Sequence, residues 1–225
     1  MPDSSDLQIA TIESAPFMEN SYVVHLTDRR DCLILDPGLE PKRIIDHVEE
    51  AQLEPVAFLC THGHADHIGG NHALKDRWPD VPLVTGKNAA AMLVDAQLNL
   101  SAAFGTPVTS PPAEVVLDEG ETYEAAGLEF EVREIPGHAP GHIIFVWHAQ
   151  PIHVFGGDVL FRGSIGLTDF PGCSCEVLNA GIQSKLFTLP DDTVVWPGHG
   201  PPTTVGHEKR TNPFVGEAAG MYGIE

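Results

Sequence analysis

The chain has 225 residues, and 42% of them are hydrophobic, which is enough for one domain with a sizeable core. Its formal net charge of -20 at pH 7 repels phosphate backbones and anionic lipids, so neither nucleic acid nor a membrane is an expected partner. The N-terminus is polar, no apolar run approaches the roughly 20 residues of a membrane span, and the sparse cysteines fit a reducing compartment, so we expect a cytoplasmic protein.

The first sixty residues show the pattern of a sheet with one covering helix. Residues 7–12 alternate as a strand does, and residues 21–26 and 32–36 predict a hairpin joined by a polar turn. A proline followed by periodic apolar residues predicts a helix over 41–51. The apolar run at 56–60 predicts a short buried strand.

The next segment is predicted to alternate between helix and strand. We expect a short helix over 70–77, a strand over 82–85 and a second helix over 87–96. Residues 99–112 contain serine, glycine and proline with few charges, which favours a loop or a lid.

The second half repeats this order. Strands are predicted over 129–135, 143–147, 153–155 and 193–196, with a helix over 177–186. Such a repeated pattern favours an α/β fold in which two sheets pack face to face and helices cover the outside.

The most informative motif directly follows the strand predicted at 56–60. Residues 61–67 read Thr-His-Gly-His-Ala-Asp-His, so three histidines and a carboxylate lie within seven residues. A strand that ends in such a loop delivers several metal-ligand side chains to one point. Burying these groups together would be costly without a cation to accept their lone pairs. The motif therefore predicts a metal site.

Three more candidate ligands follow turn signals after predicted strands. His138 lies in a Pro-Gly-His turn, Asp158 follows Gly-Gly, and His199 lies in Pro-Gly-His-Gly. The neighbouring glycines allow close approach of the backbone to a crowded centre. Imidazole and carboxylate without thiolate suit zinc, manganese or iron.

The remaining histidines are interpreted as surface or core residues. A buried histidine outside such a cluster is more often hydrogen-bonded structure than a ligand. This group comprises His25, His47, His148, His153 and His207. For His72 and His142 a role in orienting a metal ligand is the alternative, but we favour a structural role.

The order HxHxDH, GH, GD and PGHG resembles that of the metallo-β-lactamase-fold hydrolase superfamily, and the resemblance spans nearly the whole chain. It implies a four-layer αββα sandwich of two mixed β-sheets, with residues 1–225 as a single domain. It also implies two divalent metal ions, with zinc expected and iron or manganese as alternatives. By this resemblance one ion is held by His62, His64 and His138, the other by Asp66, His67 and His199, and Asp158 bridges them.

Such a centre has a defined hydrolytic chemistry. Two cations about 3.5–4 Å apart hold a hydroxide at neutral pH, and this metal-bound hydroxide attacks a carbonyl carbon. Asp66 can accept a hydrogen bond from the hydroxide and direct it, which makes it the predicted catalytic residue. A thiol leaves without a protonated acid beside it, because its pKa is near 8.5, so the site is compatible with thioester hydrolysis.

Several segments are similar to the glyoxalase II branch of this superfamily, which implies hydrolysis of an acyl-glutathione such as S-lactoylglutathione. They include residues 19–22, 36–38, 155–161, 163–172, 197–204 and 206–213. Two departures leave the substrate-binding residues open. Leu167 replaces a basic residue common in relatives, and we expect no separate C-terminal helical domain.

Other functions share parts of this pattern. A persulfide dioxygenase-like oxidoreductase of the same fold would hold a single iron with His62, His138 and Asp158. A lactonase would use the same hydrolytic centre on a different leaving group, and a metal-stabilised binding domain would not need Asp66 for activity. The catalytic hypotheses all expect a small-molecule substrate. The sequence leaves the oligomeric state open.

Overall fold

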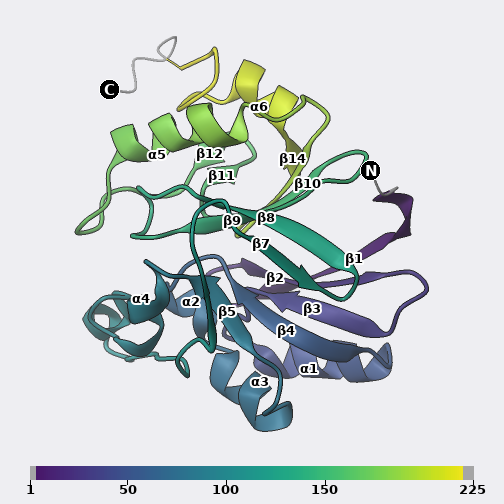
Figure 1. The fold of residues 1–225 in the computed structure, drawn as a ribbon. Helices are drawn as coiled ribbons and strands as arrows, with labels where there is room; N and C mark the ends of the chain where they lie inside the picture. Colours follow the sequence, from purple (N-terminus) through teal and green to yellow (C-terminus); the bar gives the residue numbers. More distant parts are fainter. Residues whose placement is uncertain (1–3, 220–225) are drawn as a thin grey trace.

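The computed structural model describes residues 4–219 as two β-sheets packed face to face with helices on both outer faces. In Figure 1 the N-terminal half, in purple and blue, forms the lower sheet and its helices. The C-terminal half, in green and yellow, forms the upper sheet and its helices. The predicted four-layer αββα arrangement is therefore confirmed.

The first sheet has six strands in the order β1-β2-β3-β4-β5-β6. The strands β1, β2 and β3 pair antiparallel, whereas β3, β4, β5 and β6 pair parallel. Their bounds are β1 Leu7–Ser14, β2 Glu19–Leu26, β3 Asp31–Leu35, β4 Glu54–Cys60, β5 Leu83–Gly86 and β6 Val115–Leu117. The parallel strands bring the C-terminal ends of β3 and β4 to the same edge.

The second sheet also has six strands, in the order β14-β13-β10-β9-β8-β7. Within it β10 and β13 pair parallel, and the other neighbours pair antiparallel. The bounds are β7 Thr122–Ala125, β8 Leu128–Glu134, β9 Ile143–Trp147, β10 His153–Gly157, β13 Val194–Pro197 and β14 Thr203–Thr204. A separate hairpin is made by β11 Leu160–Phe161 and β12 Ser164–Ile165.

Helices cover the outer faces, with α1 and α3 below the first sheet and α5 and α6 above the second (Figure 1). Their bounds are α1 Pro41–Glu50, α2 Ala65–Ile68, α3 Asn71–Arg77, α4 Ala90–Val94, α5 Cys175–Gly181 and α6 Val205–Thr211. Short turns are η1 Ser4–Asp6, η2 Ser101–Phe104 and the π-helical η3 Ile182–Leu186. No helix within residues 4–219 has both the length and the apolar character to span a bilayer.

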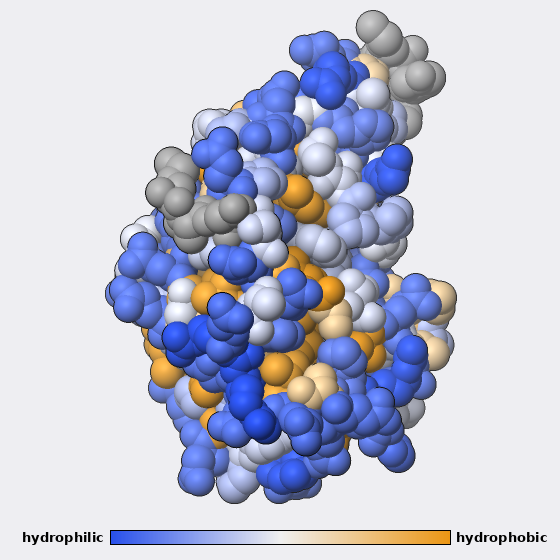
Figure 2. Space-filling model, turned by 90° about the vertical axis from the view of Figure 1, so that its right-hand side faces the viewer, coloured by the Kyte–Doolittle hydropathy of each residue, from blue (hydrophilic) through white to orange (hydrophobic). Residues whose placement is uncertain are grey.

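The apolar core has three parts, as four layers require. Between the sheets, Phe130 packs edge-on against Phe145 and Phe155, and Tyr22 packs against Phe155 from the other sheet. A second cluster lies between the second sheet and α5, and a third between the first sheet and α1. In Figure 2 apolar residues show among hydrophilic ones at the height where Figure 1 places the sheet interface.

Most predicted elements are present, but one predicted helix is shorter than expected and two helices, α2 and α6, were not predicted. The helix predicted over 87–96 is only Ala90–Val94, because residues 87–89 form the turn that ties β5 to Leu117. The histidine loop contains the short helix α2. The chain after residue 204 forms α6, whose first turn is capped when the His207 N–H donates to Thr204 Oγ1.

We expect Leu33→Ala to lower the free energy of unfolding by about 2–5 kcal/mol, because Leu33 is fully buried between the sheets and its loss leaves a cavity. The matched change Leu98→Ala, at a side chain that is 50% exposed, should stay within about 0.5 kcal/mol of wild type. Urea unfolding of the two variants measures both values. Equal losses would show that this layer does not hold the sheets together.

Candidate metal centre

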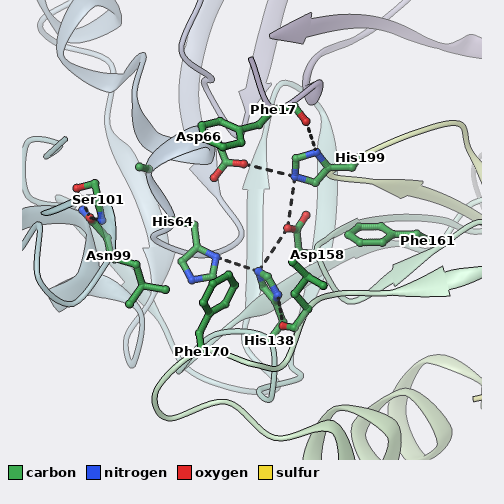
Figure 3. A pocket seen from close by; sticks show the side chains of 13 residues that line it. Phe17, His64, Asp66, Asn99, Ser101, His138, Asp158, Phe161, Phe170 and His199 are labelled. Atoms are coloured by element: carbon green, nitrogen blue, oxygen red, sulfur yellow. Dashed lines mark hydrogen bonds and ion pairs between the residues drawn. The ribbon is translucent and has the colours of Figure 1, made fainter. Parts of the chain in front are cut away.

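The seven predicted ligands come together at one edge of the sandwich, beyond the C-terminal ends of strands from both sheets. Figure 3 shows those that line the cavity, which are His64, Asp66, His138, Asp158 and His199. The loop and α2 that follow β4 supply His62, His64, Asp66 and His67. The other three follow strands of the second sheet. His138 lies after β8, Asp158 directly after β10 and His199 shortly after β13.

Three imidazole rings form the first cluster. His64 Nδ1 lies 3.0 Å from His62 Nε2 and 2.9 Å from His138 Nε2. All three side chains are buried, and their ligand atoms lie within 4.8 Å of one another. This spacing suits three nitrogen ligands of one ion.

The second cluster consists of Asp66, His67 and His199. Asp66 Oδ2 lies 3.5 Å from His199 Nε2 and 3.9 Å from His67 Nε2. Asp158 lies between the two clusters. Its Oδ1 is 3.3 Å from His67 Nε2, and its Oδ2 is 3.3 Å from His138 Nε2 and 3.4 Å from His199 Nε2. Asp158 therefore has the position that a bridging ligand needs.

The ring hydrogen bonds select the histidine form that binds metal. The Nδ1–H groups of His67, His138 and His199 can donate to Asp36 Oδ2 at 3.1 Å, Leu167 O at 2.8 Å and Phe17 O at 3.1 Å. In the neutral ring each of these bonds leaves Nε2, directed at the centre, as the atom that can bind a cation. His67 Nε2 and Asp158 Oδ1 are buried without a hydrogen bond. The donor set therefore fits divalent cations.

Comparison with known proteins assigns the family. Residues 15–199 match the sequence profile of the Metallo-beta-lactamase superfamily. The chain belongs to the metallo-beta-lactamase superfamily. It is 37% identical to a hydroxyacylglutathione hydrolase, GloC, of Haemophilus influenzae, over 93% of this chain and 98% of that protein. It is 38% identical to the probable metallo-hydrolase YqgX of Bacillus subtilis, over 89% and 93% of the two chains.

Solved structures of this superfamily are also similar. The B3 metallo-beta-lactamase BLEG-1 superposes with a TM-score of 0.88 at 36% identity, covering 92% of this chain and 99% of that one. The di-iron-bound form of TTHA1623 gives a TM-score of 0.79 at 37% identity, covering 91% and 99%. Family and fold together imply a hydrolase that uses divalent metal ions, with two ions favoured by the two clusters.

Burial sets the protonation of the first cluster. It lowers the pKa of His62 well below its usual value and that of His64 to about 3, and it also lowers the pKa of His138. These three rings are neutral at pH 7 and need not lose a proton before they bind a cation.

In the second cluster the carboxylates dominate. Burial lowers the pKa of His199, but ion pairs with Asp158 and Asp66 outweigh burial and raise this pKa to about 10. Burial raises the pKa of Asp66, but His67 and His199 outweigh it and hold this pKa below its usual value. The pKa of Asp158 is also held well below its usual value, so both carboxylates stay ionised, whereas His199 has to release a proton when it binds a cation.

Sequence reasoning missed the role of Asp36, which fixes the histidine loop from the neighbouring strand. Its Oδ1 accepts the Thr61 N–H at 2.7 Å, and its Oδ2 accepts the Thr61 hydroxyl at 2.8 Å as well as His67 Nδ1–H. Asp36 is buried and has a positive φ of 46°. The signal available in the sequence was an acidic residue at the end of a buried strand, directly before Pro-Gly.

A second missed group is Glu19, a fully buried carboxyl at the start of β2. Burial raises its pKa well above the usual value, which favours the protonated form. Its Oε2 accepts the Ser21 hydroxyl at 3.2 Å, while the backbone of Glu19 bridges to His199. Glu19 thus helps to hold the loop that carries His199 in place.

The two histidines left open behave differently. His72 is exposed on α3. His142 is fully buried, stacks on the His62 ring at a centroid distance of 4.5 Å, and its Nε2 accepts the Asp158 N–H at 3.0 Å. His142 therefore contacts two candidate ligands, which fits the alternative, a role in orienting metal ligands, better than the purely structural role that we favoured.

Gly198 shows how tightly the centre is enclosed. A Cβ atom at this position would collide with Asp158 Oδ1 and would lie 2.6 Å from His67 Cε1. Any side chain at residue 198 would therefore displace two candidate ligands.

Beside the two clusters is a cavity of about 450 Å³. Its floor is formed by candidate ligands, and the segment predicted as a loop or lid contributes part of its rim through η2 and the residues before it (Figure 3). The cavity volume is in the range that suits a small-molecule substrate.

We expect the purified protein to bind two divalent ions per chain and His199→Ala to bind about one, because the variant loses a nitrogen ligand from the second cluster only. Elemental analysis after dialysis against metal-free buffer measures the ratio. A wild-type protein that retains a single ion under metal-replete conditions would contradict the two-ion arrangement.

Replacing Asp36 should weaken metal binding although Asp36 is not a candidate ligand. We expect Asp36→Asn to reduce metal affinity about 10–100-fold, because His67 loses the carboxylate that orients its ring. Titration with a competing chelator measures this change. The exposed Asp80→Asn is the matched control and should bind as wild type does; equal affinities for all three proteins would remove this role.

Proposed function

We propose that the protein is a metal-dependent thioesterase of the glyoxalase II type, in which the seven residues hold two divalent ions. The supporting observation is the completeness of both clusters, with Asp158 within 3.4 Å of ligand atoms from each. Zinc is the expected metal, and iron or manganese would fit the same nitrogen and oxygen donors.

The ions, when bound, would lower the pKa of water and polarise a carbonyl oxygen. Asp66 supplies the directing group of this chain. Its side chain is 18% exposed, faces the cavity and is ionised, so its free lone pairs can accept a proton or a hydrogen bond from the nucleophile. The histidine clusters fix where the scissile carbonyl must lie.

Thioesters are the proposed substrates because their leaving group needs no acid. A thiol departs as thiolate at neutral pH, and the cavity lining offers no acidic side chain beyond the candidate ligands among the residues that the structure describes. Similarity to a hydroxyacylglutathione hydrolase supports this choice, and S-lactoylglutathione is the reference substrate. We further propose a single domain that acts in the cytoplasm on a small molecule.

Asp66→Asn should lower kcat for S-lactoylglutathione or another thioester by about 10²–10⁴-fold, because the amide cannot take up a proton. Thiol release followed with a chromogenic disulfide measures the rate, and the exposed Asp76→Asn is the matched control. Metal content is measured on the same samples.

Two outcomes would overturn the proposal, and a third would remove only the role of Asp66. A chain that holds one iron and consumes oxygen with a glutathione persulfide would be an oxidoreductase of the same fold. Turnover of lactones alone would identify a lactonase. Full activity of Asp66→Asn would remove the assigned role of this carboxylate.

A further inference from the structure

The cavity beside the metal centre has an unusually apolar wall. Apart from candidate ligands, its lining contains Ala65, Asn99, Ser101 and five larger apolar side chains, and these five are called the apolar wall below. The apolar wall consists of Phe17, Leu100, Phe161, Leu167 and Phe170. Within residues 4–219 the lining includes neither lysine nor arginine.

The two polar lining residues that are not candidate ligands, Asn99 and Ser101, already form hydrogen bonds within the protein. Asn99 Nδ2 donates to Met92 O at 3.2 Å and Val108 O at 2.9 Å, and Asn99 Oδ1 accepts from both the N–H and the hydroxyl of Ser101. Ser101 Oγ accepts the Val108 N–H at 2.9 Å. Both side chains thus hold the loop together, and little hydrogen-bonding capacity is left for a ligand.

Two members of the wall are fixed by the metal centre itself. The carbonyl of Leu167 accepts from His138, and the carbonyl of Phe17 accepts from His199. These bonds use only the main chain, so both side chains are free to face the cavity. Leu167 is 62% exposed and Phe17 is 52% exposed, which is much apolar surface to leave in water.

The aromatic members extend the wall down to the ligands. Phe170 lies edge-on to His64 with a centroid distance of 5.8 Å, and Phe161 lies edge-on to His199 at the same distance. Figure 3 shows Phe161 and Phe170 on different sides of the ligand group, with Phe17 near His199. A substrate carbonyl at the centre would therefore have apolar surface directly beside it.

We propose that the apolar wall is an acyl-binding subsite that selects thioesters with an uncharged, apolar acyl group of several carbons over small polar or anionic acyl groups. This inference rests on the proposed thioesterase function and narrows its substrate class, because it ranks the lactoyl group of the reference substrate S-lactoylglutathione below longer apolar acyl groups. Phe17 and Leu167 determine the specificity, because they are the wall residues held by main-chain bonds to opposite clusters.

The expected selectivity follows from burial of the acyl chain. Each methylene moved from water to the wall should raise kcat/KM by up to about fourfold, and by less where the chain stays partly exposed to water. A carboxylate on the acyl chain would lose its hydration without gaining a cation. Arg162 follows Phe161 but is exposed and is not part of the lining, so it offers an acyl carboxylate no buried partner.

The first test varies the acyl group while the thiol stays constant. Acetyl, butyryl, hexanoyl, lactoyl and succinyl thioesters of N-acetylcysteamine are hydrolysed by the metal-loaded protein. We expect hexanoyl to exceed acetyl and lactoyl by about 10–100-fold in kcat/KM, and succinyl to be the poorest. A flat series, or a series led by lactoyl or succinyl, would overturn the inference.

The second test places a charge on the wall. Leu167→Lys should lower kcat/KM for the hexanoyl thioester at least tenfold and raise it for the succinyl thioester, with metal content unchanged. Leu98→Lys is the matched control, because Leu98 is also exposed but lies outside the lining, and it should keep the wild-type order. Equal effects of the two lysines would overturn the assignment of Leu167.

A binding measurement separates this inference from the proposed function. The hexyl thioether of N-acetylcysteamine cannot be hydrolysed, and calorimetry should show that it binds at least tenfold more tightly than the methyl thioether. Phe17→Ala and Leu167→Lys should remove the difference. If no thioester is hydrolysed but the hexyl thioether binds more tightly, the thioesterase proposal is wrong and the apolar wall is still a binding site for apolar chains. If thioesters are hydrolysed and the two thioethers bind equally, only the inference about the apolar wall is wrong.

Discussion

Seven side chains that carry lone pairs or negative charge are crowded into one partly buried space, where protons or cations have to offset the charge of the carboxylates. His67 and Asp158 show this most directly, because buried atoms of both face each other without a hydrogen bond. Desolvation makes such an arrangement costly unless metal replaces the lost water. Metal binding and the stability of this edge of the fold should therefore be coupled.

The fold brings these seven candidate ligands together from both halves of the chain. The loop after β4 contributes four candidates, and three strands of the second sheet contribute one each. The layer of aromatic residues between the sheets, with Phe130 and Phe155 among them, fixes the distance between these two sources. A loss of packing in that layer would move His138 and His199 away from the other candidate ligands of their clusters, even if every ligand were retained.

The sequence was sufficient to select the seven candidate ligands that the structure brings together, because each stands beside a glycine or in a loop that follows a buried strand. It also predicted two sheets with outer helices from periodicity alone. It marked Asp36 only as an acidic residue before Pro-Gly and could not reveal the partner of this residue, since the contact with His67 joins residues 31 positions apart. The helix predicted over 87–96 is shorter than expected for a related reason. Residues 87–89 form a turn that is hydrogen-bonded to Leu117, which is distant in the sequence. The wall was equally hidden, as Phe17 and Leu167 are brought to the centre only by their carbonyls.

At residues 17 and 167 the main chain supports the metal centre while the side chain faces the cavity, so the side chain can change without the metal centre. Because the carbonyls of residues 17 and 167 orient His199 and His138, substitution of their side chains leaves the metal-binding tautomers intact. The same metal centre can then be combined with different walls, and a basic residue at 167 would suit an anionic substrate where leucine suits an apolar one. A two-metal centre accepts many carbonyl compounds. Substrate choice in this protein is therefore expected to lie in the wall, which the metal centre positions but does not constrain in character.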